Sequence, residues 1–478
     1  MHSDLCLVLD QGSHSSRALI FDRFGVCLAQ AAVPIHIQLT PPNHAEQQPD
    51  EILLALKRAA LEALSRLNQT DRSRLKSAAL ITQRSSVLCW DADSGAALTP
   101  VLSWQDRRGS HYIDQLSDQS EWIRKVTGLY PNAHTPASKL RWCMEHFKFE
   151  TASNRIKYGP ISSWLMKNLL REQPDLIDGV TAARTMLYSL QQKNWDQELL
   201  DLFKLEESML PTILPCQHHY GQLKLAGCQL PLEFVSGDQA AALFAFGDPT
   251  PEQLFINLGS GAFLNRVLPT RKQQPPLRLL HHLILAGNRS RFSAEATING
   301  AANALDWGFN TCRPHSRNLD QWATEIKHPP LFLNMIGGVG SPDWCPLDRS
   351  IWIDENEEDP KARLVAVLES ILFLIQRNMS AMEELDTPTS ILVGGGISSL
   401  NSLCQKMADL TGIPVTRYQE IEITALGAAW LALPNSHRSQ KPEKIFKPSE
   451  NKPLKQRYKR WSEQFSDHLE RVIPLADG

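Results

Sequence analysis

The sequence lacks a cysteine framework and an excess of charge of one sign. It has nine cysteines in 478 residues and no Cys-x-x-Cys pair, so neither a disulfide scaffold nor a zinc ribbon is expected. Lys and Arg total 49 and Asp and Glu total 52, which gives a formal net charge of −3. That balance removes the main electrostatic reason to expect a nucleic-acid or membrane-surface partner.

Long hydrophobic runs are also missing. The most apolar segment, residues 364–375, contains Glu369 and is too short to span a bilayer. Asp4 and Asp10 interrupt the N-terminal residues before the apolar core of a signal peptide can form. These absences predict a cytoplasmic protein with no membrane partner and no nucleic-acid partner.

The composition that remains is that of an ordinary globular protein, with 42% hydrophobic and 21% charged residues. At about 150 residues per domain, the length predicts two or three domains. Turn-forming residues cluster at 246–251, so we predict an N-terminal domain over 1–246 and a C-terminal domain over 247–435. The remaining tail, 436–478, is rich in Lys, Arg and Pro, and residues 458–472 are expected to form a solvated terminal helix.

Apolar runs separated by small or polar residues predict strands joined by short turns. Near the N-terminus they predict an antiparallel meander, then a helix with apolar residues at helical spacing, then another strand. Two similar patterns occur past the midpoint, so we predict two duplicated α/β domains. The predicted strands are 5–10, 18–21, 26–35, 78–81, 253–258, 262–267, 390–393 and 414–416, and the first predicted helix spans 49–67.

The polar turn at residues 11–17 follows the first predicted strand and is suited to binding phosphate. Small and hydroxyl-bearing residues let backbone N–H groups approach phosphate oxygens, and Arg17 supplies positive charge. Asp10, at the strand end, is a candidate Mg²⁺ ligand. The alternative is a plain hairpin with a polar loop. The turn is not a Walker A loop, because no Gly-Lys-Ser or Gly-Lys-Thr follows.

Two glycine-rich turns, 259–261 and 394–396, also follow predicted strands. Glycine permits tight turns and close backbone approach to any neighbour, whether ligand or protein. Together with the first turn, they favour a nucleotide cleft between two α/β domains.

Asp238 has two interpretations. It precedes the strong helix-forming run 240–244, so it can cap free N–H groups at a helix start. It can also act as the carboxylate that accepts the proton of a substrate hydroxyl during phosphoryl transfer. The histidine pairs 218–219 and 281–282 lack partners at metal-ligand spacing, so we expect surface or core histidines there.

Taken together, these segments resemble the FGGY carbohydrate kinase family, and within it the glycerol kinases. The resemblance covers about residues 5 to 433, nearly the whole chain. The segments that carry it, in order, are 9–18, 81–84, 103–108, 183–188, 194–196, 209–211, 237–244, 258–263, 338–344, 394–396 and 424–429.

The resemblance implies two RNase H-like domains of the actin and sugar-kinase type, with ATP and substrate in an interdomain cleft. It implies ATP and Mg²⁺ as cofactors, Asp238 as general base and Asp10 as the Mg²⁺ contact. The implied substrate-binding residues are Arg84, Ser85, Trp104, His134, Asp238 and Gln239. The implied nucleotide-binding residues are Gly12, Ser13, His14, Ser15, Arg17, Gly259, Ser260, Ala302, Asp306, Gly395, Gly396 and Asn401.

Several positions depart from the glycerol kinase pattern. Ser85 replaces a Glu and His134 replaces a Tyr, and a serine cannot supply the charge-assisted hydrogen bonds that a carboxylate makes with polyol hydroxyls. We therefore expect room for a larger polyol or a ketose. On the nucleotide side, the replacements are His14 for Thr, Ala302 for Gly, Asp306 for Gln and Leu400 for Asn, with Asn401 next in the chain.

The leading hypothesis is an ATP-dependent kinase that phosphorylates a hydroxyl of a small polyol or sugar. The alternative is a catalytically weakened nucleotide- or sugar-binding relative that acts as a sensor, and a chaperone-like ATPase ranks last. The resemblance leaves a homo-oligomer open and does not identify the acceptor.

Overall fold

The computed structural model describes residues 4–225, 229–270, 275–276, 278–345, 347–353, 359–418, 422–433 and 442–472. The chain divides into two compact units, each built from separate stretches of sequence. The first unit contains Met1–Asp248, His282–Phe292 and Glu422–Gln440, and the second contains Pro249–His281, Ser293–Ile421 and Lys441–Gly478. The domain boundaries expected from the sequence stay predictions.

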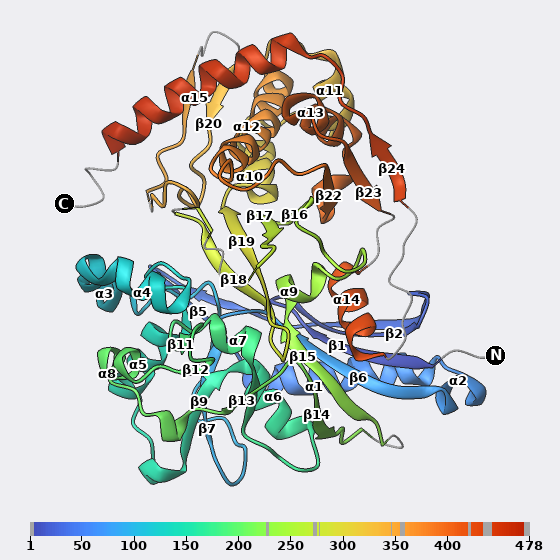
Figure 1. Ribbon diagram of the computed structural model, residues 1–478, viewed down its shortest axis with the longest axis vertical. Coiled ribbons are helices and arrows are strands. Elements are labelled where there is room, and N and C mark those ends of the chain that lie inside the picture. Colours follow the sequence, from blue (N-terminus) through green and yellow to red (C-terminus); the bar gives the residue numbers. More distant parts are fainter. Residues whose placement is uncertain are drawn as a thin grey trace. The chain divides into compact units, whose positions relative to one another are not determined.

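The first unit is built around a six-stranded sheet (Figure 1). Three consecutive strands form the antiparallel meander, and two later strands add in parallel beside the first of them. The strand order is β14 (Gln217–Gln222), β15 (Pro231–Gly237), β6 (Leu75–Thr82), β1 (Leu5–Gln11), β2 (Ser15–Asp22) and β3 (Cys27–Pro34).

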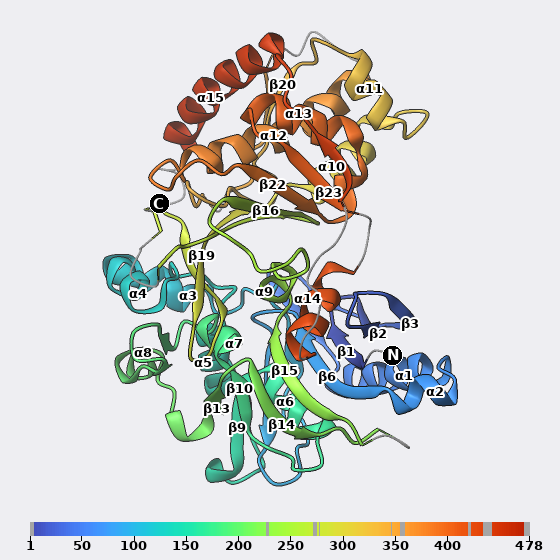
Figure 2. The same cartoon turned by 45° about the vertical axis from the view of Figure 1, so that its right-hand side comes forward.

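Two helices cover the opposite faces of this sheet (Figures 1 and 2). Helix α1 (Pro49–Ser65) buries the apolar stripe predicted from the sequence against β2 and β3. Helix α14 (Ile423–Ala432) packs on β1 and β6 and on the short helix α9 (Asp238–Ala242). Gly427 makes the α14–α9 contact close, because a Cβ there would lie 1.9 Å from the Ala241 carbonyl oxygen. The sheet is therefore buried on both sides.

Smaller sheets and helices complete the first unit. A five-stranded sheet has the order β4 (Gln38–Thr40), β5 (His44–Gln47), β8 (Val101–Leu102), β7 (Val87–Asp91) and β9 (Ile156–Pro160). The paired short strands are β10 (Leu176–Asp178) with β13 (Thr212–Leu214) and β11 (Tyr188–Ser189) with β12 (Asn194–Trp195). The other α-helices are α2 (Gln69–Ser73), α3 (Ser110–Ile113), α4 (Ser120–Thr127), α5 (Pro136–His146), α6 (Ile161–Leu169), α7 (Gly179–Ala183) and α8 (Gln197–Phe203).

The second unit repeats the topology of the first. Strands β16, β17 and β19 form an antiparallel meander, and β22 and then β23 add in parallel beside β16. The predicted duplication is therefore present as strand order and direction. The order is β18 (Leu280–Leu285), β19 (Arg291–Ile298), β17 (Ala262–Val267), β16 (Gln253–Leu258), β22 (Ser390–Gly394), β23 (Val415–Tyr418) and β24 (Pro442–Phe446).

The apolar segment 364–375 lies inside helix α12 (Pro360–Ser380), where most of its side chains are buried. Glu369, within that segment, is 2% exposed and pairs with Lys406 at 2.6 Å and Arg457 at 2.8 Å. This pairing explains a carboxylate in an apolar run. The other elements are α10 (Ala302–Cys312), α11 (Leu319–Glu325), α13 (Asn401–Thr411), β20 (Leu331–Leu333) and β21 (Ile351–Ile353).

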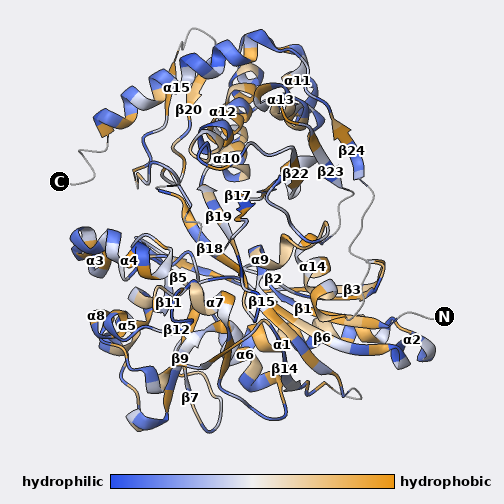
Figure 3. Cartoon of the chain, viewed as in Figure 1, coloured by the Kyte–Doolittle hydropathy of each residue, from blue (hydrophilic) through white to orange (hydrophobic). Residues whose placement is uncertain are grey.

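The predicted terminal helix is present as α15 (Lys452–Val472), which begins six residues earlier than expected. One stripe of it is buried against the second unit, including Trp461, whose indole N–H donates to the Phe332 carbonyl oxygen at 2.8 Å. The rest of α15 is largely hydrophilic, in contrast to the strands of the first sheet (Figure 3). Among the described helices, none combines the length and the hydropathy that a bilayer crossing requires.

Candidate active site

Three adjacent strands of the first sheet run in parallel and end at the same edge. Gly237, the last residue of β15, is opposite Thr82 at the end of β6, and Asp10 near the end of β1 is opposite Ile81. The residues that follow these strands therefore meet at one edge. Arg84 and Asp238 come from this edge, as does Asp10.

Asp238 and Arg84 face each other there. The Arg84 Nε lies 3.8 Å from Asp238 Oδ1, with Arg84 almost buried and Asp238 about one-third exposed. Gly237 allows this approach, since a Cβ at that position would lie 2.8 Å from Arg84 Cγ. Asp238 is the first residue of α9, and its Oδ1 accepts the Gln239 backbone N–H at 2.7 Å. Gly237 is the N-cap, and the Asp238 carboxylate accepts one free N–H of the first turn, as the helix-start interpretation expects.

Asp10 and Arg17 form the second charged group at this edge. Their side chains pair across β1 and β2, and Arg17 also pairs with Glu422, the residue just before α14. Asp10 is 2% exposed. Burial raises the pKa of Asp10 to about 6; Arg17 opposes that rise, and the charges of Asp238 and Glu422 add to it. Arg17 thus pairs with two carboxylates, so this site carries more negative than positive charge.

The predicted phosphate turn is shorter than expected. We predicted a polar turn over 11–17, but β1 continues to Gln11 and β2 begins at Ser15. Polar strand ends are stable here because their side chains have partners, such as the Ser16 hydroxyl donating to Gln11 at 2.7 Å. The turn itself is Gly12 to His14, closed by the Gly12 N–H donating to the Ser15 carbonyl oxygen at 3.0 Å.

Ser13 connects this turn to the residues predicted to bind the acceptor. Its hydroxyl donates to Gln83 Oε1 at 2.9 Å and accepts the Trp104 indole N–H at 2.8 Å. Its carbonyl oxygen accepts from Gln47 Nε2, also at 2.8 Å, and Gln47 in turn binds Gln83. The structure therefore places Ser13 beside Trp104, whereas the resemblance implied only a contact with nucleotide.

Trp104 and His134 lie together, with ring centroids 6.2 Å apart. The Trp104 indole is 36% exposed, which is high for so large a side chain. The His134 Nδ1 lies 2.8 Å from the Trp104 carbonyl oxygen, which can only accept, so the ring proton is on Nδ1 and Nε2 is the acceptor. Burial lowers the pKa of His134 to about 4, so the ring is neutral at pH 7.

Lys139 holds the two segments that carry Ser85 and Trp104. Its ammonium donates to the carbonyl oxygen of Ser85 at 2.5 Å and to that of Ser103 at 2.9 Å. Ser85 has a φ of +65°, a conformation that non-glycine residues rarely adopt, and the contact with Lys139 fixes it. Lys139 is completely buried, and burial lowers its pKa to about 7.

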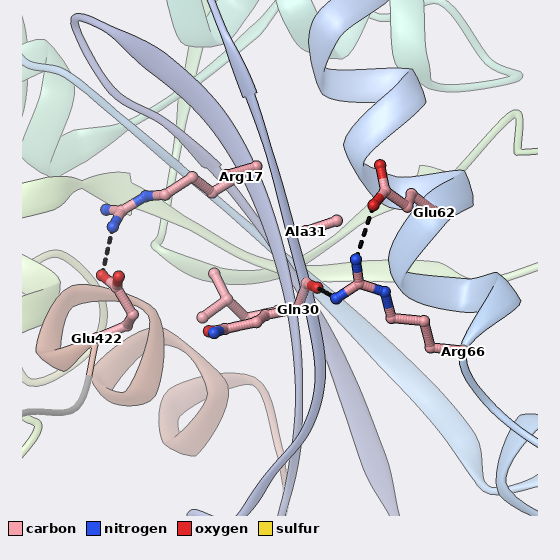
Figure 4. Close-up of a pocket in the computed structure, with 8 residues that line it drawn as sticks. Arg17, Gln30, Ala31, Glu62, Arg66 and Glu422 are labelled. Carbon is pink, nitrogen blue, oxygen red and sulfur yellow. Dashed lines mark hydrogen bonds and ion pairs between the residues drawn. The ribbon is translucent and has the colours of Figure 1, made fainter.

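A surface pocket adjoins Arg17 at the β2–β3 edge of the sheet (Figure 4). Figure 4 shows each of its two arginines directed at a glutamate of its own: Arg17 at Glu422 and Arg66 at Glu62, the latter at 2.7 Å. Arg66 also donates to the carbonyl oxygen of Gln30 on the edge strand. Because these charges are balanced within the pocket, we assign no anion to it.

The nucleotide-binding residues predicted in the second unit lie at the equivalent edge of its sheet. Strands β16 and β22 are parallel neighbours, with Asn257 opposite Gly394, so the turns that follow them are adjacent. The Ala302 N–H donates to the Gly259 carbonyl oxygen at 3.1 Å, which joins the first turn to the start of α10. Gly395 has a φ of +90°, and a Cβ there would lie 2.4 Å from the Leu258 carbonyl oxygen. Only glycine fits that position.

The remaining predicted positions lie around these turns. Asn401 begins α13, and its Oδ1 accepts from Arg417 Nη2 and Lys444 Nζ, each at 3.2 Å. Arg417 also donates to the carbonyl oxygens of residues 398 and 399, so it fixes the segment after the glycine turn. Asp306 is exposed, one helical turn after Ala302 in α10. Ser260 accepts the backbone N–H of residue 303 through its carbonyl oxygen at 3.2 Å.

Sequence reasoning missed several residues that organise these edges. Four of them bond to a predicted site residue or to the backbone beside one: Gln83, Lys139, Glu422 and Arg417. Gln83 lies inside a segment that carries the family resemblance, and Lys139 follows shortly after the departure at His134, so their positions were a weak indication. Glu422 and Arg417 had no local pattern to mark them. His282 was expected to be a surface or core histidine; it is buried, and its Nε2 lies 3.3 Å from Arg84 Nη1.

Comparison with known proteins places the chain among sugar kinases. Residues 5–245 match the model of the N-terminal domain of the FGGY family of carbohydrate kinases, and residues 254–435 match that of its C-terminal domain. The glycerol kinase of Trichlorobacter lovleyi is 30% identical over 441 residues, covering 89% of each chain. That of Symbiobacterium thermophilum is 30% identical over 453 residues, covering 90% of each.

Solved structures show the same fold. The glycerol kinase of Plasmodium falciparum, determined with ADP, has a TM-score of 0.87 at 19% identity and covers 98% of both chains. A xylulose kinase from Brucella ovis has a TM-score of 0.86 at 22% identity and covers 98% of this chain and all of its own. The expected two-domain fold of the actin and sugar-kinase type is therefore confirmed, as is the resemblance.

Proposed function

Because this chain belongs to the FGGY family of carbohydrate kinases, we propose that it transfers the γ-phosphoryl group of ATP to a hydroxyl of a small polyol or sugar. The observation that carries the proposal is the convergence of Asp238, Arg84 and the Asp10–Arg17 pair at the ends of three parallel strands. Phosphoryl transfer to an alcohol requires a proton acceptor and positive charge near the transferred group. These residues supply both.

In this proposal Asp238 is the general base. Its carboxylate accepts the proton of the acceptor hydroxyl as that oxygen forms its bond to the γ-phosphorus, and the bond from phosphorus to the bridging oxygen of ADP breaks. Asp238 is partly exposed, so an incoming hydroxyl has access to it. Arg84 orients the acceptor from the next strand, and the exposed face of Trp104 packs against its carbon atoms.

The acceptor side favours a substrate larger than glycerol or differently substituted. Ser85 offers one short hydroxyl where a glycerol kinase carries a carboxylate, and His134 offers a neutral ring with an acceptor nitrogen. The proteins that this chain resembles include glycerol kinases and a xylulose kinase, and these names guide the choice of candidate acceptors. We therefore include glycerol, pentitols and ketoses in the expected range.

The donor side has the chemistry for ATP and Mg²⁺. The described residues include no group of three or more His, Cys, Asp or Glu side chains that could hold a metal alone. Mg²⁺ bound with a nucleotide needs only one or two carboxylates, since phosphate oxygens and water fill its other positions. The buried Asp10, with its raised pKa, fits that role. When bound, Mg²⁺ would neutralise charge on the phosphates. Among the described residues, none has an atom within 4 Å of a Cβ built at Gly396, so this turn leaves room for the close backbone approach that a nucleotide requires.

The test is a coupled ADP-release assay with glycerol, pentitols, ketopentoses and ketoheptoses, using wild type, Asp238→Asn and the exposed control Asp118→Asn. We expect at least one acceptor to give turnover, Asp238→Asn to lose about a thousandfold or more in kcat, and Asp118→Asn to match wild type. ATP binding by Asp238→Asn, measured by calorimetry, should stay close to wild type. Full activity in Asp238→Asn would remove the assigned base. ATP binding with no turnover on any acceptor would favour the sensor alternative.

A further inference from the structure

The end of the β18–β19 hairpin belongs to the first unit, although the chain on either side of it belongs to the second. It is fixed there at Cys216. The Cys216 N–H donates to the Ala286 carbonyl oxygen at 3.0 Å, and the Ala286 N–H donates to the Cys216 sulfur at 3.4 Å. Gly179 provides the space, because a Cβ there would lie 2.7 Å from Ala286 Cβ. The hairpin end is thus tightly packed within the first unit.

His282 lies in this hairpin, 1% exposed, and its Nε2 is 3.3 Å from Arg84 Nη1. A guanidinium has only donors, so Arg84 donates and the His282 Nε2 accepts. The imidazole is therefore neutral in this arrangement, with its proton on Nδ1. A histidine 198 positions away in sequence thus determines where one nitrogen of the Arg84 fork lies.

The position of that fork matters for Asp238. The Arg84 Nε lies 3.8 Å from Asp238 Oδ1, which is longer than a hydrogen bond. The Arg84 guanidinium therefore lies beside the carboxylate proposed as the general base, and its orientation bears on how an acceptor meets that base. The contact with His282 restricts that orientation, because it holds Arg84 Nη1.

We propose that His282 is a positioning residue of this kinase: it orients Arg84 toward the acceptor. The inference rests on the proposed function. His282 does not itself touch the acceptor, so its effect is transmitted through Arg84. His281 provides the control, because successive residues of a strand point to opposite faces and His281 is also buried.

The test compares steady-state kinetics of four variants on the acceptor identified by the screen. We expect His282→Ala to raise the KM for the acceptor about tenfold or more and to change the KM for ATP by less than about twofold. His282→Gln should restore most of the loss, because its amide oxygen reaches the position of Nε2. His282→Asn should not, because its oxygen reaches only the position of Nδ1. His281→Gln should leave the acceptor KM at the wild-type value.

Nuclear magnetic resonance of ¹⁵N-histidine-labelled protein gives an independent readout. We expect His282, identified by the peak that His282→Gln loses, to carry its proton on Nδ1. A proton on Nε2 would overturn the inference, as would an acceptor KM unchanged in His282→Ala. So would failure of His282→Gln to restore activity, or a matching rise in the KM for ATP, since either indicates a merely structural role. If wild type phosphorylates no acceptor, the proposed function fails. The tautomer of His282 still shows whether its Nε2 accepts a hydrogen bond from Arg84.

Discussion

The turn after β1 and the turn after β16 occupy equivalent places in two sheets of the same topology, yet they are held in different ways. The first is held by side chains: Ser13 bonds to Gln83 and Trp104, and Arg17 pairs with Asp10 beside it. Both turns are closed by a backbone bond of 3.0 Å, from the Gly12 N–H to the Ser15 carbonyl oxygen and from the Gly259 N–H to the Gly261 carbonyl oxygen, so the side-chain bonds are what distinguishes the first. Under the proposed function, the charged side chains of the first turn would place reacting groups, whereas the small residues of the second would let a phosphate approach the backbone closely.

The largest effect is expected from removing the charge that balances the first edge. Arg17→Met leaves the buried Asp10 without its cation and should lower the free energy of unfolding by about 3 kcal/mol at pH 8. The matched control is Arg66→Met in the same pocket, whose exposed pair with Glu62 is worth less than about 1 kcal/mol. Urea unfolding measures both.

The pH dependence of this loss gives its cause. The raised pKa of Asp10 means that the carboxyl takes up a proton as the pH falls through about 6, and a neutral carboxyl needs no cation. The Arg17→Met loss should therefore be smaller at pH 5 than at pH 8, and adding Asp10→Asn should recover most of it. Equal losses in Arg17→Met and Arg66→Met would contradict the role of burial.

A comparison of two glycines in the second unit separates the free-energy cost of a strained backbone conformation from the cost of steric overlap. Gly395 and Gly412 both have positive φ, +90° and +73°, but a Cβ would overlap the Leu258 carbonyl oxygen only at Gly395. Gly412→Ala should cost about 1 kcal/mol of unfolding free energy from strain alone. Gly395→Ala should cost about 1 kcal/mol more, because the strand end must shift. Similar thermal melting temperatures for the two variants would show that the overlap is relieved without cost.

Lys139 predicts a smaller, pH-dependent effect at the first edge. Its folded-state pKa of about 7 is lower than the ordinary value of 10.5, so between these values the unfolded chain holds a proton that the folded protein has released. Stability should therefore rise with pH in that window. From pH 7 to 8.5 the rise in wild type should exceed that in Lys139→Met by about 1.5 kcal/mol. Parallel curves for the two proteins would show that Lys139 keeps its proton.

The smallest change tests the backbone approach to nucleotide. Among the residues that the structure describes, none has an atom within 4 Å of a Cβ added at Gly396, so Gly396→Ala should alter the unfolding free energy by less than about 0.5 kcal/mol. A nucleotide beside this turn would meet the new methyl group, and the KM for ATP should rise several-fold. An unchanged KM for ATP would place the nucleotide away from Gly396.

Much of the fold could be read from local pattern. Strands β16 and β17 match the predicted bounds, because apolar runs lie on either side of the glycine turn at 259–261. The polar turn over 11–17 was overestimated for a reason that no local rule contains. Ser16 and Arg17 remain in a strand because Gln11 and Asp10, across the hairpin, bond to their side chains.

The site was predicted as a set of residues but not as a set of contacts. Asp10, Arg84 and Asp238 follow strands in the sequence, so their meeting at one edge follows from parallel topology. Their partners could not be foreseen: Glu422 lies 405 positions from Arg17, and His282 lies 198 from Arg84. No periodicity or motif connects residues so far apart.

Sequence alone therefore determined the family, the N-terminal meander and the strands that border the glycine turns, since these depend on neighbouring residues and short-range pattern. Only the folded chain decided which carboxylate shares which arginine, which imidazole nitrogen accepts and which groups titrate near neutrality. Coulombic attraction and the cost of leaving water depend on distance and burial, and both are set by packing between segments that are remote in the chain.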